Sequence, residues 1–399
     1  MTVELVPSAA SRPTASQPSA TGAAATATGA KATGAAATGT APVPARVAAF
    51  PRLRYMGSKY ALLPVLHDVF SSVAPVSSRD PGGRGGAVRP STAIDAFSGS
   101  GVVSYLMKAE GRQVVSNDFL AFPAVIARAS VVNGSTTLSD ELVDEICGPP
   151  ADDRDVVRRT FDGVFFSADD RAFLDSAWSH VDRLVGAERD LAIAGLVLAA
   201  ARKQPRGVFT FTGARYDDGR RDLRLTMAEQ FRAAVRAYGA TVFDDGLAHE
   251  AVEGDVADLG RPPADLVYLD PPYAPPRDDA DYMKRYHFLQ GLAVYWRGQT
   301  IMTETKTKKI AKLFTPFAYP RTVDDALVRT FEQFADAGAL VLSYSSNAVP
   351  SRERIEQLMR TVKPHVEVRV VDHTYSFGTH RAATRTAATE YVFVGRDRP

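Results

Sequence analysis

The amino-acid sequence predicts an α/β fold built around a mostly parallel β-sheet. From Phe50 onward, short apolar stretches of strand length alternate with stretches of helical pattern, and this alternation is typical of sheets with crossover helices. The apolar stretch 91–96 runs into a turn of small residues and then into a helical stretch, as at the ligand-binding edge of such sheets. We expect the last two predicted strands to pair as an antiparallel hairpin at one edge of the sheet.

The predicted elements follow in chain order. Strands are expected at 91–96, 113–116, 241–243, 251–253, 266–269, 339–344, 366–371 and 390–394, and helices at 102–110 and 122–133. Residues 134–245 interrupt the alternation with helical stretches at 168–185 and 189–202, then a hairpin at 208–219. We therefore predict an inserted, mainly helical module at 134–245 and a discontinuous α/β domain formed by 49–133 and 246–399.

Residues 1–48 consist largely of Ala, Thr, Gly, Ser and Pro. Such a segment buries too little apolar surface to offset its ordering entropy, so we predict a disordered tail. The Gly-, Arg- and Pro-rich stretch 77–90 predicts a loop.

Composition excludes several classes of protein. No apolar run reaches the roughly 18 residues that a membrane-spanning helix needs, and the longest, residues 191–201, predicts a core helix. The single cysteine, Cys147, excludes an internal disulfide and a cysteine-rich metal site. We expect a cytoplasmic protein without a bound metal. Net charge is only +1, but residues 202–236 contain nine Lys or Arg against four Asp or Glu, which suggests a phosphate-binding surface or a solvated basic face.

The segment Asp270-Pro271-Pro272-Tyr273 is the most specific signal in the chain. It follows the apolar stretch 266–269, at the strand end where open α/β sheets bind ligands. The two prolines remove two backbone donors, so the segment offers carbonyl acceptors, a carboxylate and an aromatic ring. This combination suits a flat ring bearing an NH₂ group, such as a base extruded from DNA, whose stacking on an aromatic ring is worth roughly 1–3 kcal/mol.

Two further signals suggest a nucleoside-containing ligand. In the stretch from Asp95 to Gly101, an acidic residue ends a strand and a small-residue turn leads into a helix, which lets the backbone approach a ligand closely. By itself this pattern also fits a generic tight turn. Asp118 ends the next predicted strand, where it is placed either to accept hydrogen bonds from ribose hydroxyls or to cap the following helix.

Taken together and in this order, Arg54-Tyr55-Met56-Gly57-Ser58-Lys59, the turn Asp95 to Gly101, Asn117-Asp118 and Asp270-Pro271-Pro272-Tyr273 resemble the Dam-like family of DNA adenine-N6 methyltransferases. The resemblance covers about residues 50–396. It implies a Rossmann-like methyltransferase sheet and a site-specific enzyme that transfers a methyl group from S-adenosylmethionine to N6 of a flipped-out adenine in double-stranded DNA. It also makes a cognate restriction endonuclease a candidate partner.

The resemblance implies a role for each matching position. Tyr55, Gly57 and Lys59 would lie near the methionine end of the cofactor, with Lys59 meeting its carboxylate. Asp95, Phe97, Ser98, Gly99 and Gly101 would line its methionine and ribose portions, and Asp118 would take the ribose hydroxyls. Asp255 would lie near the adenine amine, although a turn cap would look the same. Ser58 stands where the family's commoner motif has a second glycine. Asp270, Pro271, Pro272 and Tyr273 would hold the target amine.

DNA contacts are expected from two basic groups and two flanking segments. The first group is Arg202, Lys203, Arg206, Arg215, Arg220, Arg221 and Arg224, and the second is Lys306, Lys308 and Lys309 with Lys312. The aromatic and basic segment 282–296 either closes over the flipped base or forms a packed helix. The predicted loop 373–389, with His380, Arg381 and Arg385, is a further candidate.

Two alternatives remain open from sequence. Cytosine-N4 methylation needs the same two acceptors and the same stacking ring, although the aspartate at the first position and the motif order favour adenine. A DNA-binding protein of the same fold without turnover is the other, and the filled catalytic and cofactor positions argue against it.

Overall fold

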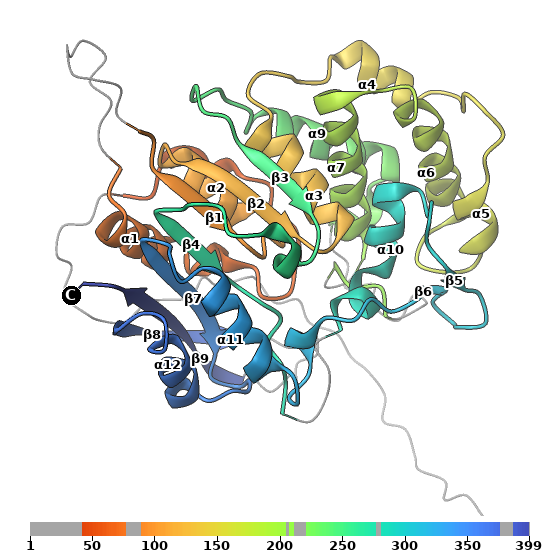
Figure 1. The fold of residues 1–399 in the computed structure, drawn as a ribbon. Helices are drawn as coiled ribbons and strands as arrows, with labels where there is room; N and C mark the ends of the chain where they lie inside the picture. Colours follow the sequence, from red (N-terminus) through yellow and green to blue (C-terminus); the bar gives the residue numbers. More distant parts are fainter. Residues whose placement is uncertain are drawn as a thin grey trace, which may run out of the picture. The chain divides into compact units, whose positions relative to one another are not determined.

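The computed structural model describes residues 42–76, 89–204, 207–210, 221–276, 281–375 and 386–398. Its centre is a seven-stranded sheet with the order β3-β2-β1-β4-β7-β9-β8 (Figure 1). The strands are β1 (Thr92–Asp95), β2 (Gln113–Asp118), β3 (Glu250–Glu253), β4 (Leu266–Leu269), β7 (Ala339–Ser345), β8 (His365–Tyr375) and β9 (Thr386–Arg396). The neighbouring strands β3, β2, β1, β4 and β7 pair in parallel, whereas β9 is antiparallel to both β7 and β8. The predicted parallel sheet with an antiparallel edge hairpin is confirmed.

Each strand divides its side chains between two cores, as the two-residue period of a strand requires. On β4, Leu266 and Tyr268 belong to one core, and Val267 and Leu269 belong to the other. The first core receives side chains from α1 (Leu63–Val73), α2 (Val102–Ala109) and α3 (Ala121–Ala127), and the second from α11 (Val323–Gln333) and α12 (Arg352–Met359). The sheet is therefore covered by helices on both faces, which is the doubly wound arrangement that the alternation predicted.

The strand order identifies where this sheet can bind a ligand. From β1 the chain adds β2 and β3 on one side, and then places β4 and β7 on the other side of β1. The carboxyl ends of β1 and β4 therefore border a topological switch point, where open α/β sheets bind their ligands. Asp95 is the last residue of β1, and Asp270 directly follows β4.

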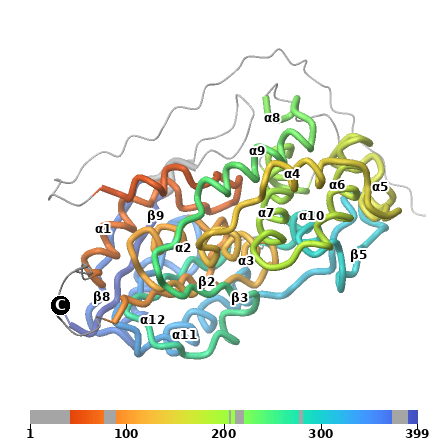
Figure 2. Tube along the Cα trace, turned by 90° about the horizontal axis from the view of Figure 1, so that it is seen from above, coloured from red at the N-terminus to blue at the C-terminus, as the bar shows by residue number. Residues whose placement is uncertain are grey.

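A group of helices lies to one side of the sheet (Figures 1 and 2). It contains α4 (Asp140–Ile146), α5 (Val156–Thr160), α6 (Ala168–Val181), α7 (Gly186–Lys203), α8 (Arg221–Arg224), α9 (Met227–Gly239) and α10 (Tyr282–Val294). The α7 helix is its core, because every residue from 191 to 201 is buried, as the sequence predicted. In the described parts of 134–245 there are helices and no strand, which agrees with the expected helical character of the insertion. The boundaries of that module stay a prediction.

Short elements complete the described chain. They are the 3₁₀ helices η1 (Ala45–Ala49), η2 (Lys59–Ala61), η6 (Val256–Leu259) and η7 (Pro316–Ala318), the π-helical turn η3 (Arg128–Val132), and the small hairpin of β5 (Ile301–Met302) and β6 (Lys309–Ile310). The η1 helix corrects the predicted end of the tail at residue 48. Val47 is buried and the Arg46 guanidinium lies 3.9 Å from the centre of the Phe243 ring, so the chain is already packed there.

Three other predictions need correction. Residues 241–243 do not form a strand, because Thr241 donates both its N–H and its hydroxyl to the carbonyl of Tyr238 at the end of α9. Of the hairpin predicted at 208–219, the described part is not a strand either: the Phe209 N–H donates to the Arg285 carbonyl, and its ring stacks on Phe288 at 5.0 Å. The rest of that prediction lies outside the described residues. The loop predicted at 373–389 is wrong at both ends, since β8 continues to Tyr375 and β9 begins at Thr386, and residues 376–385 lie outside the described residues.

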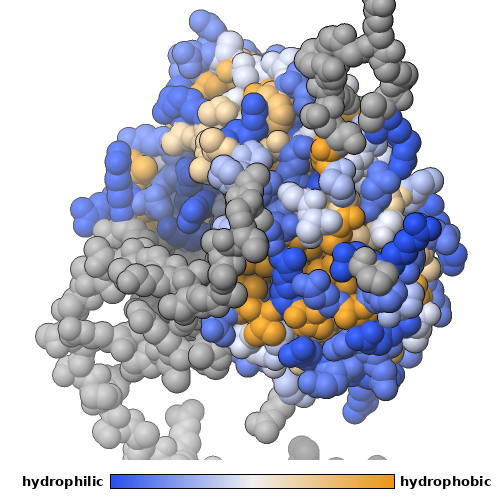
Figure 3. Space-filling view, turned by 90° about the vertical axis from the view of Figure 1, so that its left-hand side faces the viewer, coloured by the Kyte–Doolittle hydropathy of each residue, from blue (hydrophilic) through white to orange (hydrophobic). Residues whose placement is uncertain are grey.

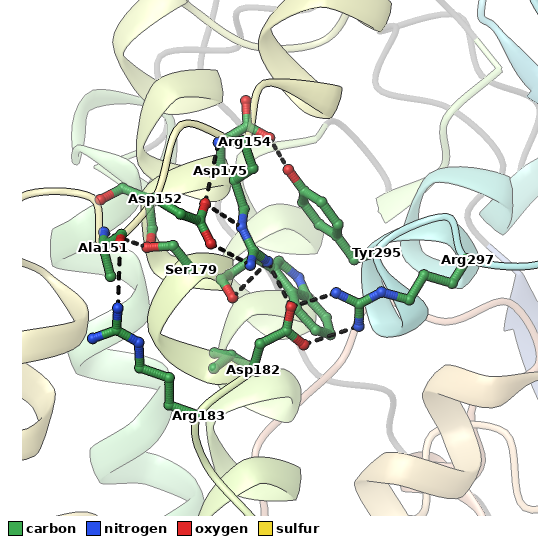
Figure 4. A network of polar contacts seen from close by, with 12 residues as sticks. Ala151, Asp152, Arg154, Asp175, Ser179, Asp182, Arg183, Tyr295 and Arg297 are labelled. Carbon is green, nitrogen blue, oxygen red and sulfur yellow. Dashed lines mark hydrogen bonds and ion pairs between the residues drawn. The ribbon is translucent and has the colours of Figure 1, made fainter.

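An ionic cluster joins the helical group to the segment that follows α10. Arg154 and Arg297 both approach Asp182 at the end of α6 (Figure 4), with nitrogen–oxygen distances of 2.7 and 2.9 Å, and Arg189 lies 3.1 Å away. Tyr295 adds a hydrogen bond to Asp175 at 2.7 Å. Burial acts to raise the pKa of Asp182, but hydrogen bonds from Arg297, Arg154 and Arg189 outweigh it and hold the pKa below its ordinary value.

We expect Asp182→Ala to lower the free energy of unfolding by about 2 kcal/mol or more, because three arginines lose a charged acceptor. Since the pKa of Asp182 is lowered by folding, this stabilisation is present above about pH 4 and is lost as the pH falls. Urea unfolding at pH 7 and at about pH 2.5 would measure both effects. Asp324→Ala, which breaks an exposed pair with Arg354 at 2.9 Å, is the matched control with a small expected effect. Equal losses in the two variants would contradict the assignment.

On the face shown in Figure 3, hydrophobic residues gather near the middle and hydrophilic residues surround them.

No helix among the described residues is long and apolar enough to cross a membrane. The same residues contain no cluster of three or more His, Cys, Asp or Glu side chains that could hold a metal ion.

Candidate active site

A pocket lies at the carboxyl ends of β1 and β4 and contains about 510 Å³ of open space. Asp270 and Pro272 contribute to its wall, together with eight of the ten residues predicted to bind a cofactor. Those eight are Tyr55, Gly57, Lys59, Asp95, Phe97, Ser98, Gly99 and Asp118. The structure thus brings residues from all four sequence motifs, separated by up to about 200 residues, to one cavity.

The turn after β1 leaves no room for larger side chains. Gly99 has φ +50°, and a Cβ added there would lie 2.8 Å from the Tyr55 ring. Gly101, with φ +80°, precedes the first residue of α2 and does not line the pocket, so its part is to let the chain enter that helix. The backbone N–H of Gly99 donates to the Asp118 carboxylate at 2.8 Å. The turn and the end of β2 are therefore locked together.

Asp118 and Asp95 are buried carboxyl groups at neighbouring strand ends. Burial raises the pKa of Asp118 to about 6, against the opposing hydrogen bonds from the N–H groups of Leu120 and Gly99. Burial also raises the pKa of Asp95 to about 7, although the Ser104 hydroxyl donates to it at 2.6 Å. Asp118 does not cap the N-terminus of α3, whose N-cap residue is Leu120. Burial thus makes ionisation of both acids less favourable than it is in water.

Several buried polar atoms at this site have no hydrogen-bond partner among the described residues. They are Asp95 Oδ1, Ser98 Oγ and Asn117 Oδ1. Buried polar atoms normally have partners, so three unpartnered ones beside one cavity indicate a ligand with several polar groups. This fits a cofactor that carries hydroxyl and amine groups.

A second, smaller pocket adjoins the first and shares Phe97, Phe119 and Pro272 with it. Asp255 and Phe317 also line this pocket, which has about 260 Å³ of open space. Asp255 is at the same time the N-cap of η6, because its carboxylate accepts the Ala257 N–H at 3.0 Å. Both uses that the sequence left open for Asp255 are therefore compatible with its position.

Asp270 is held by one side chain from its own segment and by side chains from two other segments. Lys59 Nζ lies 2.7 Å from Asp270 Oδ2, and the hydroxyls of Tyr273 and Ser343 donate to Oδ1 at 2.9 and 3.0 Å. Burial raises the pKa of Asp270, and the charge of Lys59 is the main opposing influence. Lys59, predicted near a cofactor carboxylate, is thus paired with Asp270 in this structure.

Tyr273 also differs from its predicted position. Its ring packs against Tyr344 with a centroid distance of 4.8 Å, and its hydroxyl reaches both Asp270 and Glu390. Tyr273 does not line the first pocket, and neither does Pro271. The structure therefore shows Tyr273 as a hydrogen-bonding partner of Asp270, and its use as a stacking surface stays a prediction.

The α10 helix supports the segment that carries Lys59. Tyr286 is buried, stacks on Tyr55 at 4.8 Å and accepts the Met56 N–H at 2.6 Å, while Tyr282 donates to the Met56 carbonyl at 3.3 Å. Of the two interpretations of residues 282–296, the packed helix is confirmed. Tyr282 alone reaches the first pocket from this helix.

The predicted DNA-binding residues fall into different environments. Arg221, Arg224 and Lys306 are exposed, while Arg202, Lys308 and Lys309 are half-buried. Lys203 is mostly buried, with Nζ at 2.5 Å from Asp170 and 2.8 Å from the Leu225 carbonyl, so it is a structural contact and not an exposed phosphate ligand. Lys312 Nζ lies 3.2 Å from Asp281 Oδ2. Arg206, Arg215, Arg220, His380, Arg381 and Arg385 lie outside the described residues.

Sequence reasoning missed two residues that contact Asp270 or its partners. Ser343 lies on β7 and Glu390 on β9, and Glu390 is only 1% exposed. For Glu390 the sequence offered one signal, a single acidic residue at the start of the apolar strand predicted at 390–394. No local motif connects it with Asp270.

Comparison with known proteins finds two similarities to adenine-N6 DNA methyltransferases and their relatives. The sequence profile described as "D12 class N6 adenine-specific DNA methyltransferase" matches residues 55–154. The chain is also 24% identical to "Type II methyltransferase M2.HphI" of Haemophilus parahaemolyticus over 341 residues, which cover 82% of this chain and 92% of that protein. In these residues the chain is similar to D12-class adenine-N6 DNA methyltransferases. The profile covers the Tyr55–Lys59 segment, the turn after β1 and Asp118, and the alignment with the relative is long enough to extend beyond these motifs.

Proposed function

We propose that this protein is an adenine-N6 DNA methyltransferase of the D12 class. It uses S-adenosylmethionine and acts on an adenine flipped out of double-stranded DNA, with Asp270 and Pro271 accepting the two hydrogens of its N6 amine. The observation that carries the proposal is the common pocket. Asp270, after β4, and the glycine turn, after β1, line the same cavity at the switch point of the sheet. An amine acceptor and a cofactor-type turn then face each other without any rearrangement of the sheet.

The residues present suit such a cofactor. Asp118 offers a carboxylate for ribose hydroxyls, and the unpartnered Ser98 Oγ and Asp95 Oδ1 offer further polar contacts. The smaller pocket, with Phe119, Phe317 and Asp255, suits an adenine ring and its amine. When bound, S-adenosylmethionine supplies an electrophilic methyl group on a positively charged sulfur.

The chain's own groups prepare the nucleophile. The N6 lone pair of adenine is delocalised into the ring, and hydrogen bonds from the amine to the Asp270 carboxylate and the Pro271 carbonyl favour a more tetrahedral nitrogen. The prolines contribute by removing competing N–H donors. Lys59 keeps Asp270 ionised against the effect of burial. Catalysis then rests on positioning and electrostatics.

The test is direct. Purified protein, duplex DNA and methyl-labelled S-adenosylmethionine should yield N6-methyladenine on mass spectrometry of the hydrolysed DNA. Label in N4-methylcytosine, or no label in DNA at all, would overturn the proposal. Sequencing of methylated DNA from expressing cells would then give the recognition site.

Cofactor affinity should depend on pH. In the ligand-free site the pKa values of Asp118 and Asp95 are raised to about 6 and about 7, and a cationic ligand with ribose hydroxyls favours their ionised forms. Lowering the pH from 8 to 5 should therefore weaken binding at least about tenfold, as expected for one group whose pKa is near 6. Calorimetric titration with S-adenosylmethionine measures this, and Asp118→Asn should flatten the dependence. Affinity that is constant over this range would contradict the roles of both acids.

The raised pKa values of Asp118 and Asp95 also determine how the stability of the ligand-free protein depends on pH. Their pKa values in the folded, ligand-free protein exceed the ordinary 3.8, so the ligand-free protein loses stability as the pH rises from about 4 to about 7. The cofactor should consequently raise the melting temperature more at pH 8 than at pH 5.

DNA contacts are proposed from the exposed cations Arg221, Arg224 and Lys306, because exposed Lys and Arg can neutralise phosphates. The relative's description as a type II methyltransferase supports a further proposal, a cognate restriction endonuclease that cuts the same site. A cytoplasmic location stays a prediction.

A further inference from the structure

Tyr273 does not present its ring to the cavity in which the extruded base would bind. The ring packs on Tyr344 with a centroid distance of 4.8 Å, and the hydroxyl is bonded to Asp270 and Glu390. Tyr273 is also not among the residues that line the first pocket. An aromatic face for a base that bonds Asp270 must then come from another part of the pocket wall.

Five aromatic side chains line the first pocket, and three of them have other partners. Phe97 and Phe119 also line the smaller pocket, which is proposed for the adenine ring of the cofactor. Tyr268 is 1% exposed, and its hydroxyl lies 2.7 Å from Ser343 Oγ. The two that remain are Tyr55 and Tyr282.

Tyr55 lies at the cofactor end of the cavity. Its ring stacks on Tyr286 of α10 with a centroid distance of 4.8 Å and an angle of 15° between the rings. On the glycine turn, a Cβ added at Gly99 would lie 2.8 Å from the Tyr55 ring. Tyr55 therefore fits between α10 and the glycine turn, and this position leaves little room for a base.

Tyr282 lies toward the Asp270 end of the same cavity. A Cβ added at Gly57 would lie 3.5 Å from the Tyr282 hydroxyl oxygen and 3.7 Å from Lys59 Nζ. Lys59 Nζ in turn lies 2.7 Å from Asp270 Oδ2. The Tyr282 hydroxyl and the cation that pairs with Asp270 are thus on the same side of Gly57.

Electrostatics agree with these two positions. Burial is the main cause that raises the pKa of both phenols. Among the nearby carboxylates, Asp118 raises the pKa of Tyr55 more than Asp270 does, whereas Asp270 raises the pKa of Tyr282 more than Asp118 does. This order is expected if Tyr55 faces the ribose site and Tyr282 faces the methyl-accepting site.

The local structure fixes the Tyr282 ring before any base arrives. Tyr282 is the first residue of α10, and the carboxylate of the N-cap residue Asp281 accepts the Lys284 N–H at 2.8 Å. The ring packs against Tyr55 at 5.5 Å, and the hydroxyl donates to the Met56 carbonyl at 3.3 Å. The side chain is only half-buried. A wall that is held in this way loses little conformational entropy when a ligand packs on it.

We propose that Tyr282, rather than Tyr273, supplies the aromatic face on which the extruded adenine stacks while Asp270 accepts its amine. This assignment rests on the proposed function, and it makes Tyr282 a substrate-contacting residue at the first turn of a packed helix. Stacking needs only the π-face of the base, so the contact holds the ring while Asp270 and Pro271 hold the amine. Tyr273 then acts on the base only through its hydrogen bond to Asp270.

The test compares removal of the ring with removal of the base. Tyr282→Leu deletes the aromatic ring and keeps apolar bulk, and an abasic site at the target position deletes the base. Binding to labelled duplexes that carry the recognition site is measured by fluorescence anisotropy with S-adenosylhomocysteine present. The variant should bind the adenine-containing duplex about fivefold to 100-fold more weakly, the range for loss of one base–aromatic stack. Its affinity for the abasic duplex should stay within about twofold of the wild type, as a contact between the two deleted groups requires.

Companion variants show whether the loss belongs to the ring. Tyr282→Phe retains the ring and should bind both duplexes within about twofold of the wild type. Tyr391→Leu is the matched control, because Tyr391 is also half-buried but packs on Phe393 of β9 and lies under the Arg352 guanidinium. Calorimetric titration should give a cofactor affinity for Tyr282→Leu within about twofold of the wild type. Tyr282→Met provides the same comparison if Tyr282→Leu folds poorly.

Three results would overturn the assignment. Equal weakening on the adenine-containing and abasic duplexes would make Tyr282 a structural support of α10. Unchanged binding to both duplexes would remove Tyr282 from the base site, and a loss confined to cofactor affinity would place it in the cofactor site. A wild-type protein that transfers no methyl group to DNA would instead refute the proposed function, which is a separate failure.

Discussion

Asp270→Ala should abolish methyl transfer while S-adenosylmethionine still binds. The Asp270 carboxylate is the one charged acceptor proposed for the N6 amine, and without it the nitrogen lone pair stays delocalised in the adenine ring. Removal of a single preorganised electrostatic group at a reacting centre costs about 10²–10³ in rate. We expect a loss at or above this range, because Asp270 also positions the amine.

The expected persistence of cofactor binding follows from the geometry. Asp270 shares the pocket with the cofactor residues, yet its own partners are Lys59, Tyr273 and Ser343. The glycine turn and Asp118 are bonded to each other independently of Asp270. Single-turnover assays and calorimetric titration on the same preparation would test the two halves of the prediction.

Asp270→Asn is the matched control for the charge. Asparagine keeps an oxygen acceptor of similar shape, so its activity should lie between that of the wild type and that of Asp270→Ala. A fully active Asp270→Ala variant would remove this residue from the mechanism. Loss of cofactor binding in both variants would show that Asp270 belongs to the cofactor site.

The sequence predicted the parts of this site that local signals describe. Asp95, Asp118 and Asp270 each end or directly follow a short apolar strand, and parallel strands bring their carboxyl ends to the same edge. Gly99 and Gly101 were identifiable as turn residues because they lie in the small-residue stretch between a predicted strand and a predicted helix. These positions could be derived because strand direction, unlike strand order, is readable from the alternation of strands and helices.

Other features depended on contacts between distant segments. Ser343 reaches Asp270, and Glu390 reaches Tyr273, only because β9 pairs with β7 and β7 with β4, and this pairing leaves no local pattern. Lys203 resembled its basic neighbours in sequence, but α7 places it against Asp170. The pattern at 241–243 suited a strand, and hydrogen bonds to the end of α9 decided against it.

Lys59→Met should shift the pH dependence of activity to higher pH and lower the activity at pH 7 by about 100-fold or more, within the range for loss of a charged catalytic partner. Lys59 is 4% exposed, and its Nζ lies 2.7 Å from Asp270. Burial raises the pKa of Asp270, and the nearby Lys59 charge is the largest influence that lowers it. Without the lysine the pKa of Asp270 rises further, so the ionised fraction at pH 7 falls and recovers only as the pH increases.

This variant also separates two roles for Lys59. If the lysine meets the methionine carboxylate of the cofactor, as the family resemblance implied, Lys59→Met should raise the KM for S-adenosylmethionine without moving the pH profile. If it keeps Asp270 ionised, as the 2.7 Å pair indicates, the profile of kcat should move while cofactor affinity changes little. Lys59→Arg retains the charge and should leave the position of the profile near that of the wild type. A profile of unchanged position in Lys59→Met would show that another group ionises Asp270, and the pairing seen here would then be structural only.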